Sequence, residues 1–143
     1  MELLVVLLLA ALVIHFPRKD GPARIKRRDG GCPVVDVTFN DDQAEEMIVD
    51  TGCSRTTITQ KMAKNLGVRT IGKSRAQIAN GDTIEFDVAV VDSIEVGGVK
   101  AKEVIVGIAP DKLDIGLLGQ NFYGKYDVNI KRDVVEFNES VDA

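Results

Sequence analysis

Residues 47–58 read Met-Ile-Val-Asp-Thr-Gly-Cys-Ser-Arg-Thr-Thr-Ile, and this stretch decides the fold that the sequence predicts. The apolar run 47–49 is typical of a buried strand, and Asp50 follows it in a hydroxyl-rich turn. A carboxylate at the end of an apolar strand is partly removed from water, which prepares it for proton transfer. Gly52 allows a sharp turn and the close approach of another group, and Thr51 can hydrogen-bond to a neighbouring loop. Asp50, Thr51 and Gly52 are therefore the candidate catalytic residues.

A second stretch, residues 117–122, reads Leu-Leu-Gly-Gln-Asn-Phe and begins 67 residues after Asp50. Together the two stretches resemble the paired signatures of the retropepsin-like aspartic proteases. In that family, apolar residues and Asp-Thr-Gly are followed four residues later by Ser or Thr, and further downstream by two apolar residues and a Gly before a short helix. The resemblance covers most of the chain from Val34 to Phe137. It implies a set of residues that support the loop of Asp50: Thr56, Leu117, Leu118 and Gly119.

Periodicity and turn residues in the same region favour an all-β domain. The predicted strands cover residues 34–39, 44–49, 74–79, 83–91, 93–96, 99–108, 126–130 and 134–137. A helix is predicted over residues 60–66, with Thr59 as its N-cap and Gly67 as its stop. The resemblance implies a retropepsin-like closed β-barrel or sandwich, the acid-protease half, with one or two short helices.

The dipeptide Asn80-Gly81 is a strong signal for a β-hairpin turn between the strands 74–79 and 83–91. In the family that the chain resembles, this hairpin is the flap that closes over a bound peptide, and Ala79, Asn80 and Gly81 lie at the corresponding position. An ordinary surface hairpin is the alternative. The common viral pattern places Ala and Asp after the triplet, and that Asp contacts the substrate backbone. Ser54 at its position is expected to change substrate affinity and cleft geometry, and to leave the catalytic pair intact.

Hydrolysis of a peptide by two carboxylates needs one ionised group to accept a proton from water and one protonated group to polarise the carbonyl. The chain contains a single Asp-Thr-Gly: the stretch 114–116 is Asp-Ile-Gly and lacks the hydroxyl, and Asp82-Thr83 is followed by Ile. A two-fold symmetric homodimer would bring two copies of Asp50 together on its axis. The resemblance implies that Thr51 exchanges hydrogen bonds across this axis and that Gly52 leaves room for the substrate. The sequence therefore predicts a homodimeric aspartic endopeptidase acting on peptides or proteins.

The chain begins with a hydrophobic segment, residues 3–16, followed by six basic residues between Arg18 and Arg28. Fourteen helical residues span roughly 21 Å, which is short of the roughly 30 Å hydrocarbon core. No basic residue precedes the run and no small-x-small site follows it, so an uncleaved N-terminal anchor is favoured over a signal peptide. The expected organisation is an anchor over 1–17, a basic Gly/Pro-rich linker over 18–33 and a protease domain over 34–138.

The predicted location is the membrane, with a single-pass N-terminal anchor and two possible orientations. The basic stem favours a cytoplasmic protease domain by the positive-inside rule, whereas the resemblance to bacterial members of the family allows an extracytoplasmic one. The stem is also compatible with a solvated tether on anionic lipid headgroups.

Composition argues against several other activities. From Asp29 onward, 12 basic residues stand against 20 acidic ones, a net charge of −8 with few aromatic residues, which argues against nucleic-acid binding. No metal site or cofactor is expected, because Cys32 and Cys53 are far apart, the chain has one His, and no Gly-rich loop precedes a helix. The two cysteines are compatible with one disulfide, although a small buried side chain is the simpler interpretation of Cys53.

A binding protein is the competing functional class. The same fold could dimerise and hold an extended peptide as an added strand without cutting it. The intact Asp-Thr-Gly favours the enzyme, because a binding module has no need of an ionisable pair on its axis.

Overall fold

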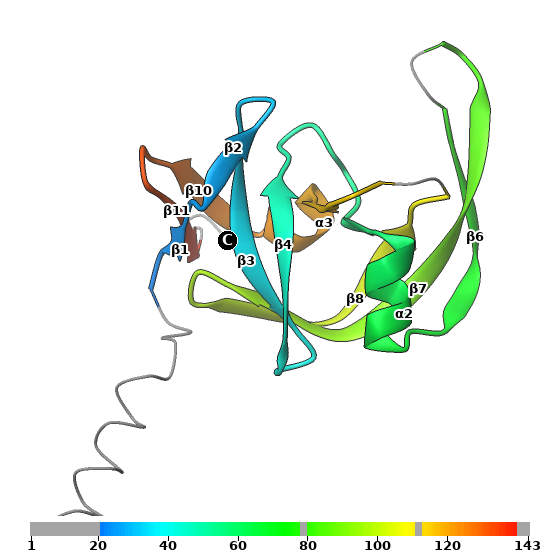
Figure 1. The fold of residues 1–143 in the computed structure, drawn as a ribbon, viewed down its shortest axis with the longest axis horizontal. Coiled ribbons are helices and arrows are strands. Elements are labelled where there is room, and N and C mark those ends of the chain that lie inside the picture. Colours follow the sequence, from blue (N-terminus) through cyan, green and yellow to red (C-terminus); the bar gives the residue numbers. More distant parts are fainter. Residues whose placement is uncertain (1–20, 78–79, 111–112, 140–143) are drawn as a thin grey trace, which may run out of the picture.

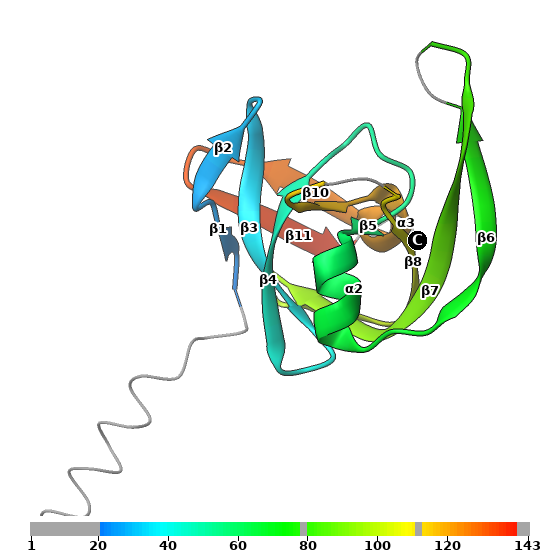
Figure 2. The same cartoon turned by 45° about the vertical axis from the view of Figure 1, so that its right-hand side comes forward.

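The computed structural model of the chain describes residues 21–77, 80–110 and 113–139. An eight-stranded sheet dominates this part of the chain, and its strand order is β2-β3-β4-β9-β5-β8-β7-β6. Because β3 also pairs with β7, through Thr38 with Glu95 and Phe39 with Ile94, the sheet closes on itself (Figures 1 and 2). The strands are β2 (Arg27–Asp29), β3 (Cys32–Phe39), β4 (Gln43–Val49), β5 (Thr57–Ile58), β6 (Thr70–Gln77), β7 (Thr83–Val96), β8 (Val99–Ile108) and β9 (Gly116–Leu118). The predicted all-β closed barrel is confirmed.

A smaller antiparallel sheet has the order β1-β11-β10, formed by β1 (Ala23–Arg24), β11 (Val134–Glu139) and β10 (Tyr126–Ile130). Strands β1 and β2 lie inside the segment 18–33 that the composition predicts as a linker. Ala23 pairs with Val135 and is buried, and Arg27 pairs with Val34. From residue 23 this part of the predicted linker is thus folded, because the pairing of β1 with β11 and of β2 with β3 satisfies its backbone groups.

The predicted anchor over 1–17 lies outside the described residues. Within the part of the chain that the structure describes, no helix is both long and apolar enough to cross a membrane.

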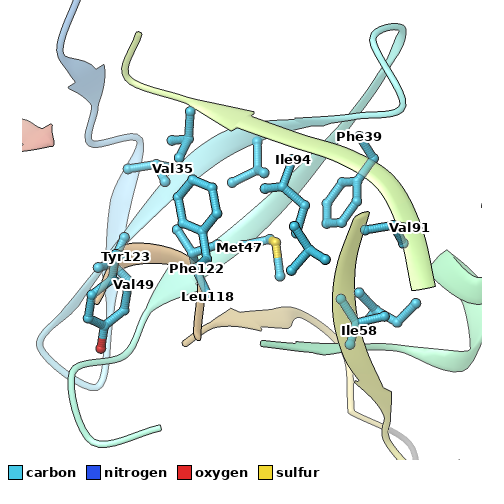
Figure 3. Packing of buried hydrophobic residues seen from close by; sticks show 14 of the residues in the cluster. Val35, Phe39, Met47, Val49, Ile58, Val91, Ile94, Leu118, Phe122 and Tyr123 are labelled. Atoms are coloured by element: carbon cyan, nitrogen blue, oxygen red, sulfur yellow. The ribbon is translucent and has the colours of Figure 1, made fainter. Parts of the chain in front are cut away.

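The core is built from the alternating apolar residues of the barrel strands. In β3, Val35, Val37 and Phe39 are all fully buried, as the period-two pattern predicts. Figure 3 shows Phe39, Met47, Ile94 and Phe122 pointing toward one another, so that β3, β4, β7 and the segment after β9 share one core. Burial of each large apolar side chain stabilises the fold by about 1.5–3 kcal/mol.

Two short helices accompany the strands. Helix α2 (Gln60–Leu66) begins after Thr59, whose hydroxyl accepts a hydrogen bond from the Met62 N–H at 3.0 Å, and ends at Gly67, which has a φ of 65°. Both ends confirm the sequence prediction. Helix α3 (Gln120–Tyr123) directly follows β9 and Gly119.

The β6–β7 hairpin has Asn80 and Gly81 near its tip. Among the described residues, its outermost pair joins Gln77 and Thr83. The Asn80 side chain accepts a hydrogen bond from the Asp82 N–H at 2.9 Å, and Gly81 has a φ of 92°. The Asn80 side chain thus satisfies a backbone N–H of the turn. Ala79 lies outside the described residues.

Candidate active site

Asp50 lies directly after β4, where the chain leaves the barrel. Parallel pairing of Val49 with Leu118 is continued by a hydrogen bond from the Asp50 N–H to the Leu118 carbonyl at 3.2 Å. The half-buried side chain accepts a hydrogen bond through Oδ1 from the Gly52 N–H at 3.0 Å. The Asp50 carbonyl accepts the Cys53 N–H at 3.2 Å. The carboxylate is therefore held by its own turn, with its remaining acceptor positions available.

The N-terminal end of helix α3 forms hydrogen bonds to the loop of Asp50. The first N–H groups of a helix have no partner inside it. Here the Gln120 N–H donates to the Cys53 carbonyl at 2.8 Å, and the Asn121 N–H donates to the Ser54 carbonyl at 3.0 Å. The Gln120 side chain also donates to the Thr51 carbonyl at 2.9 Å. The two sequence signatures are thus joined directly, and the loop is fixed by backbone contacts.

Thr56 connects the end of the loop with the same helix. Its side chain is fully buried, and its hydroxyl accepts the Gly119 N–H at 3.0 Å. The Thr56 N–H donates to the Asn121 side chain at 2.7 Å, and that side chain donates in turn to the Ile105 carbonyl at 2.7 Å. These contacts lock the position of the loop relative to β8.

The structure brings most of the predicted site residues together. The loop and its support contain Asp50, Thr51, Gly52, Ser54, Thr56, Leu117, Leu118 and Gly119. A pocket of about 410 Å³ adjoins the loop; residues 53–55 line it from the loop, and Ile84 and Phe86 line it from the β6–β7 hairpin. Asn80 and Gly81 do not line this pocket, since they lie at the hairpin tip, which extends away from the barrel in both ribbon views (Figures 1 and 2).

Three contacts to the loop were not predicted from the sequence. They come from Gln120, Asn121 and Tyr123, all on α3. The signal was present, since Gln120 and Asn121 lie within the second signature, residues 117–122, and Tyr123 follows it directly.

The cysteines are free thiols in the described structure, and no disulfide joins Cys32 to Cys53. The Cys53 thiol donates to the Arg55 carbonyl at 2.9 Å. Cys53 therefore acts as a small side chain that packs within the loop.

Gly119 has no room for a side chain. A Cβ at this position would lie 2.5 Å from the Arg55 carbonyl carbon and 2.7 Å from the Thr56 nitrogen, both of them backbone atoms. Gly119→Ala should therefore push the loop of Asp50 away from α3 and lower the free energy of unfolding by about 2–4 kcal/mol. Thermal or urea unfolding measures this loss. Gly72→Ala is the matched control, because its Cβ would meet nothing within 4 Å; equal destabilisation of both variants would contradict the close contact.

The side chain of Tyr123 contacts the backbone of Asp50. Its hydroxyl donates to the Asp50 carbonyl at 2.7 Å. Burial, with smaller contributions from the charges of Asp50 and Cys53, raises the pKa of Tyr123 above its usual value of 10.0. The folded state thus favours the neutral phenol, so this contribution to stability is complete below about pH 10 and is lost as the pH rises through the folded-state pKa.

Tyr123→Phe should lower the free energy of unfolding by about 1 kcal/mol at neutral pH, since one hydrogen bond is lost. It should also flatten the loss of stability above pH 10, because no phenol remains to ionise. Urea unfolding between pH 7 and 11 measures both effects. An alkaline loss as steep as that of the wild type would show that Tyr123 does not cause it.

Comparison with known proteins assigns the chain to a family. Residues 35–122 match the family model described as aspartyl protease, and the chain belongs to that family. Among solved structures, it is similar to a retropepsin-like aspartic protease from Rickettsia conorii, with a TM-score of 0.63 and 22% sequence identity over 82% of this chain and 90% of that one. The fold is therefore retropepsin-like. No curated protein matches the chain.

Proposed function

We propose that the chain is a membrane-anchored, homodimeric aspartic endopeptidase in which two copies of Asp50 activate one water molecule. One observation carries this proposal: the Asp50 carboxylate stands at the end of a buried strand, in a turn fixed by its own N–H groups and by α3. Membership of the aspartyl protease family supports peptide hydrolysis as the reaction.

The reaction needs both carboxyl groups in different protonation states. The ionised Asp50 accepts a proton from water as the water oxygen bonds to the scissile carbonyl carbon. The protonated Asp50 of the second copy donates its proton to the carbonyl oxygen. The tetrahedral intermediate then collapses: the C–N bond breaks, the leaving nitrogen takes the proton that the first Asp50 accepted from water, and one hydroxyl of the intermediate returns a proton to the second Asp50. The products are a carboxylic acid and an amine, and the pair again holds one proton.

The dimer follows from the count of carboxylates. Each chain supplies one Asp-Thr-Gly, and a two-fold axis through the loop would place the second Asp50 opposite the first. In this arrangement Thr51 hydrogen-bonds across the axis. Gly52 keeps the floor of the cleft low, so that the substrate backbone can approach both carboxylates.

The proposed flap is the β6–β7 hairpin with Ala79, Asn80 and Gly81 at its tip. The pocket beside the loop is walled by the inner residues of this hairpin, so movement of the hairpin would open and close the cleft. Residues 3–16 would hold both copies in one membrane, with the protease domain on the cytoplasmic side if the basic stem decides the orientation.

Activity should peak on the acid side of neutrality. The pair works only while it holds one proton, so the rate should fall when the second carboxyl group also ionises. We expect a bell-shaped profile of kcat/KM for cleavage of a mixed peptide library, and inhibition by a statine-type mimic of the tetrahedral intermediate. A rate that climbs steadily into the alkaline range would indicate a different nucleophile. Tight peptide binding without cleavage at any pH would instead favour the non-catalytic binding module.

A further inference from the structure

Arg55 occupies an unusual position in the loop of the candidate site. It follows Ser54 and is half-buried, and its guanidinium carbon lies 5.8 Å from the centre of the Phe86 ring. Gly107 on β8 leaves space for both side chains. A Cβ at residue 107 would lie 3.2 Å from the Phe86 ring and 3.7 Å from the Arg55 Cδ. The fold therefore leaves space for an arginine of the loop beside an aromatic ring of the hairpin.

The pocket around Arg55 carries positive charge over an apolar wall. The described lining residues include no Asp or Glu, and their apolar members include Ile84, Phe86 and Ile108. Arg75 also lines the pocket, but its guanidinium lies 3.6 Å from the Glu85 carboxylate. Among the described residues, Arg55 has no ion-pair partner. Among the described lining residues, Arg55 therefore carries the positive charge that no carboxylate neutralises.

The Arg55 guanidinium carries its N–H bonds in its own plane, where a carboxylate can accept two of them at once. The methylene groups of a bound Glu would pack against the apolar wall. A Lys or Arg side chain would bring a second positive charge into a partly desolvated space.

We infer that Arg55 is a specificity-determining residue, and that this pocket selects peptides with an acidic side chain, Glu or Asp, at the position that enters it. This inference rests on the proposed function for its meaning as protease specificity. The preference of the pocket for an acidic side chain can be tested by peptide binding alone, without cleavage.

The test measures binding of fluorescent peptides to the full chain carrying Asp50→Asn, so that no peptide is cut. Each peptide is compared with versions that carry Glu, Gln or Lys at one position at a time. At one position, Glu should bind about tenfold more tightly than Gln, because donor and acceptor then carry opposite charges in a partly exposed site. Lys at that position should bind more weakly than Gln.

Variants of Arg55 then decide whether this residue is responsible. Adding Arg55→Gln should remove the preference for Glu over Gln, and Arg55→Glu should reverse it in favour of Lys. Arg55→Lys should retain a weaker preference, since the charge remains without the planar fork. Arg132→Gln makes the same change of charge in the turn between β10 and β11 and should leave the preference unaltered. Circular dichroism shows that each variant is folded, and the Lys variant keeps the test decisive if another one is not.

Three results would overturn the assignment: no position prefers Glu, the preference survives Arg55→Gln, or it disappears with Arg75→Gln while Arg55→Gln leaves it intact. Failure of the proposed hydrolysis is a separate result. If wild-type chain binds Glu peptides through Arg55 and never cuts them, the pocket assignment holds and the proposed peptidase activity fails.

Discussion

Asp50→Asn is expected to lower kcat/KM for every cleaved peptide by on the order of 10⁴-fold or more. Asparagine has nearly the shape of aspartate, and its side-chain oxygen can still accept the Gly52 N–H that holds Asp50 Oδ1. The turn and the fold should therefore survive. What is lost is the charge that accepts a proton from water, and a dimer with two amides has no other group to replace it. Initial rates on a peptide identified from the wild-type cleavage library measure the effect.

The control for this variant is Asp114→Asn. Asp114 also belongs to an Asp-x-Gly stretch, but it is exposed and precedes β9, away from the turn of Asp50. Its replacement should leave the rate within about twofold of the wild type, as is usual for exposed positions. If Asp50→Asn cuts as fast as Asp114→Asn, the catalytic site has been placed on the wrong residue.

Specific activity should collapse when the enzyme is diluted below its dimer dissociation constant. A monomer holds one carboxylate and should be inactive, so at low concentration the activity per subunit should fall in proportion to concentration. The full chain in lipid vesicles should resist dilution better than residues 21–143 in solution, because a shared membrane raises the effective concentration of the two copies. The shortened chain should begin at residue 21, since β1 and β2 belong to the fold.

A dilution series of specific activity, paired with sedimentation velocity at the same concentrations, measures this dependence. Tyr123→Phe is the control for an effect of fold stability alone, because it weakens the fold and leaves the number of carboxylates per chain unchanged. Full activity of a monomeric species at nanomolar concentration would contradict the shared pair.

Local sequence patterns predicted much of this structure. The cap at Thr59 and the stop at Gly67 predicted both ends of α2, because each depends on a few adjacent residues. The alternation in residues 34–39 likewise predicted the buried face of β3. A short apolar run followed by a turn also led to Asp50, Thr51 and Gly52 as the candidate catalytic residues.

Contacts between distant segments were harder to predict. Tyr123 reaches Asp50 across 73 residues, and Asn121 reaches Thr56 across 65. Neither contact has a periodic pattern, since it depends on how β9 lies beside β4. Strand β1 was missed for a similar reason: Ala23-Arg24 in a basic, Gly- and Pro-rich stretch has no strand pattern of its own, and it becomes a strand by pairing with β11.

The most direct test of two Asp50 carboxylates in one site is a subunit-mixing experiment. Wild-type chain at constant concentration is mixed with increasing Asp50→Asn chain under dilute conditions that allow exchange, and the mixture is then concentrated and assayed. Random pairing leaves about one-tenth of the wild-type subunits in wild-type dimers at a ninefold excess of the variant. The account predicts that activity falls to about that level, because heterodimers hold a single ionisable carboxylate. Activity that stays constant at every excess of the variant would show that each chain works alone.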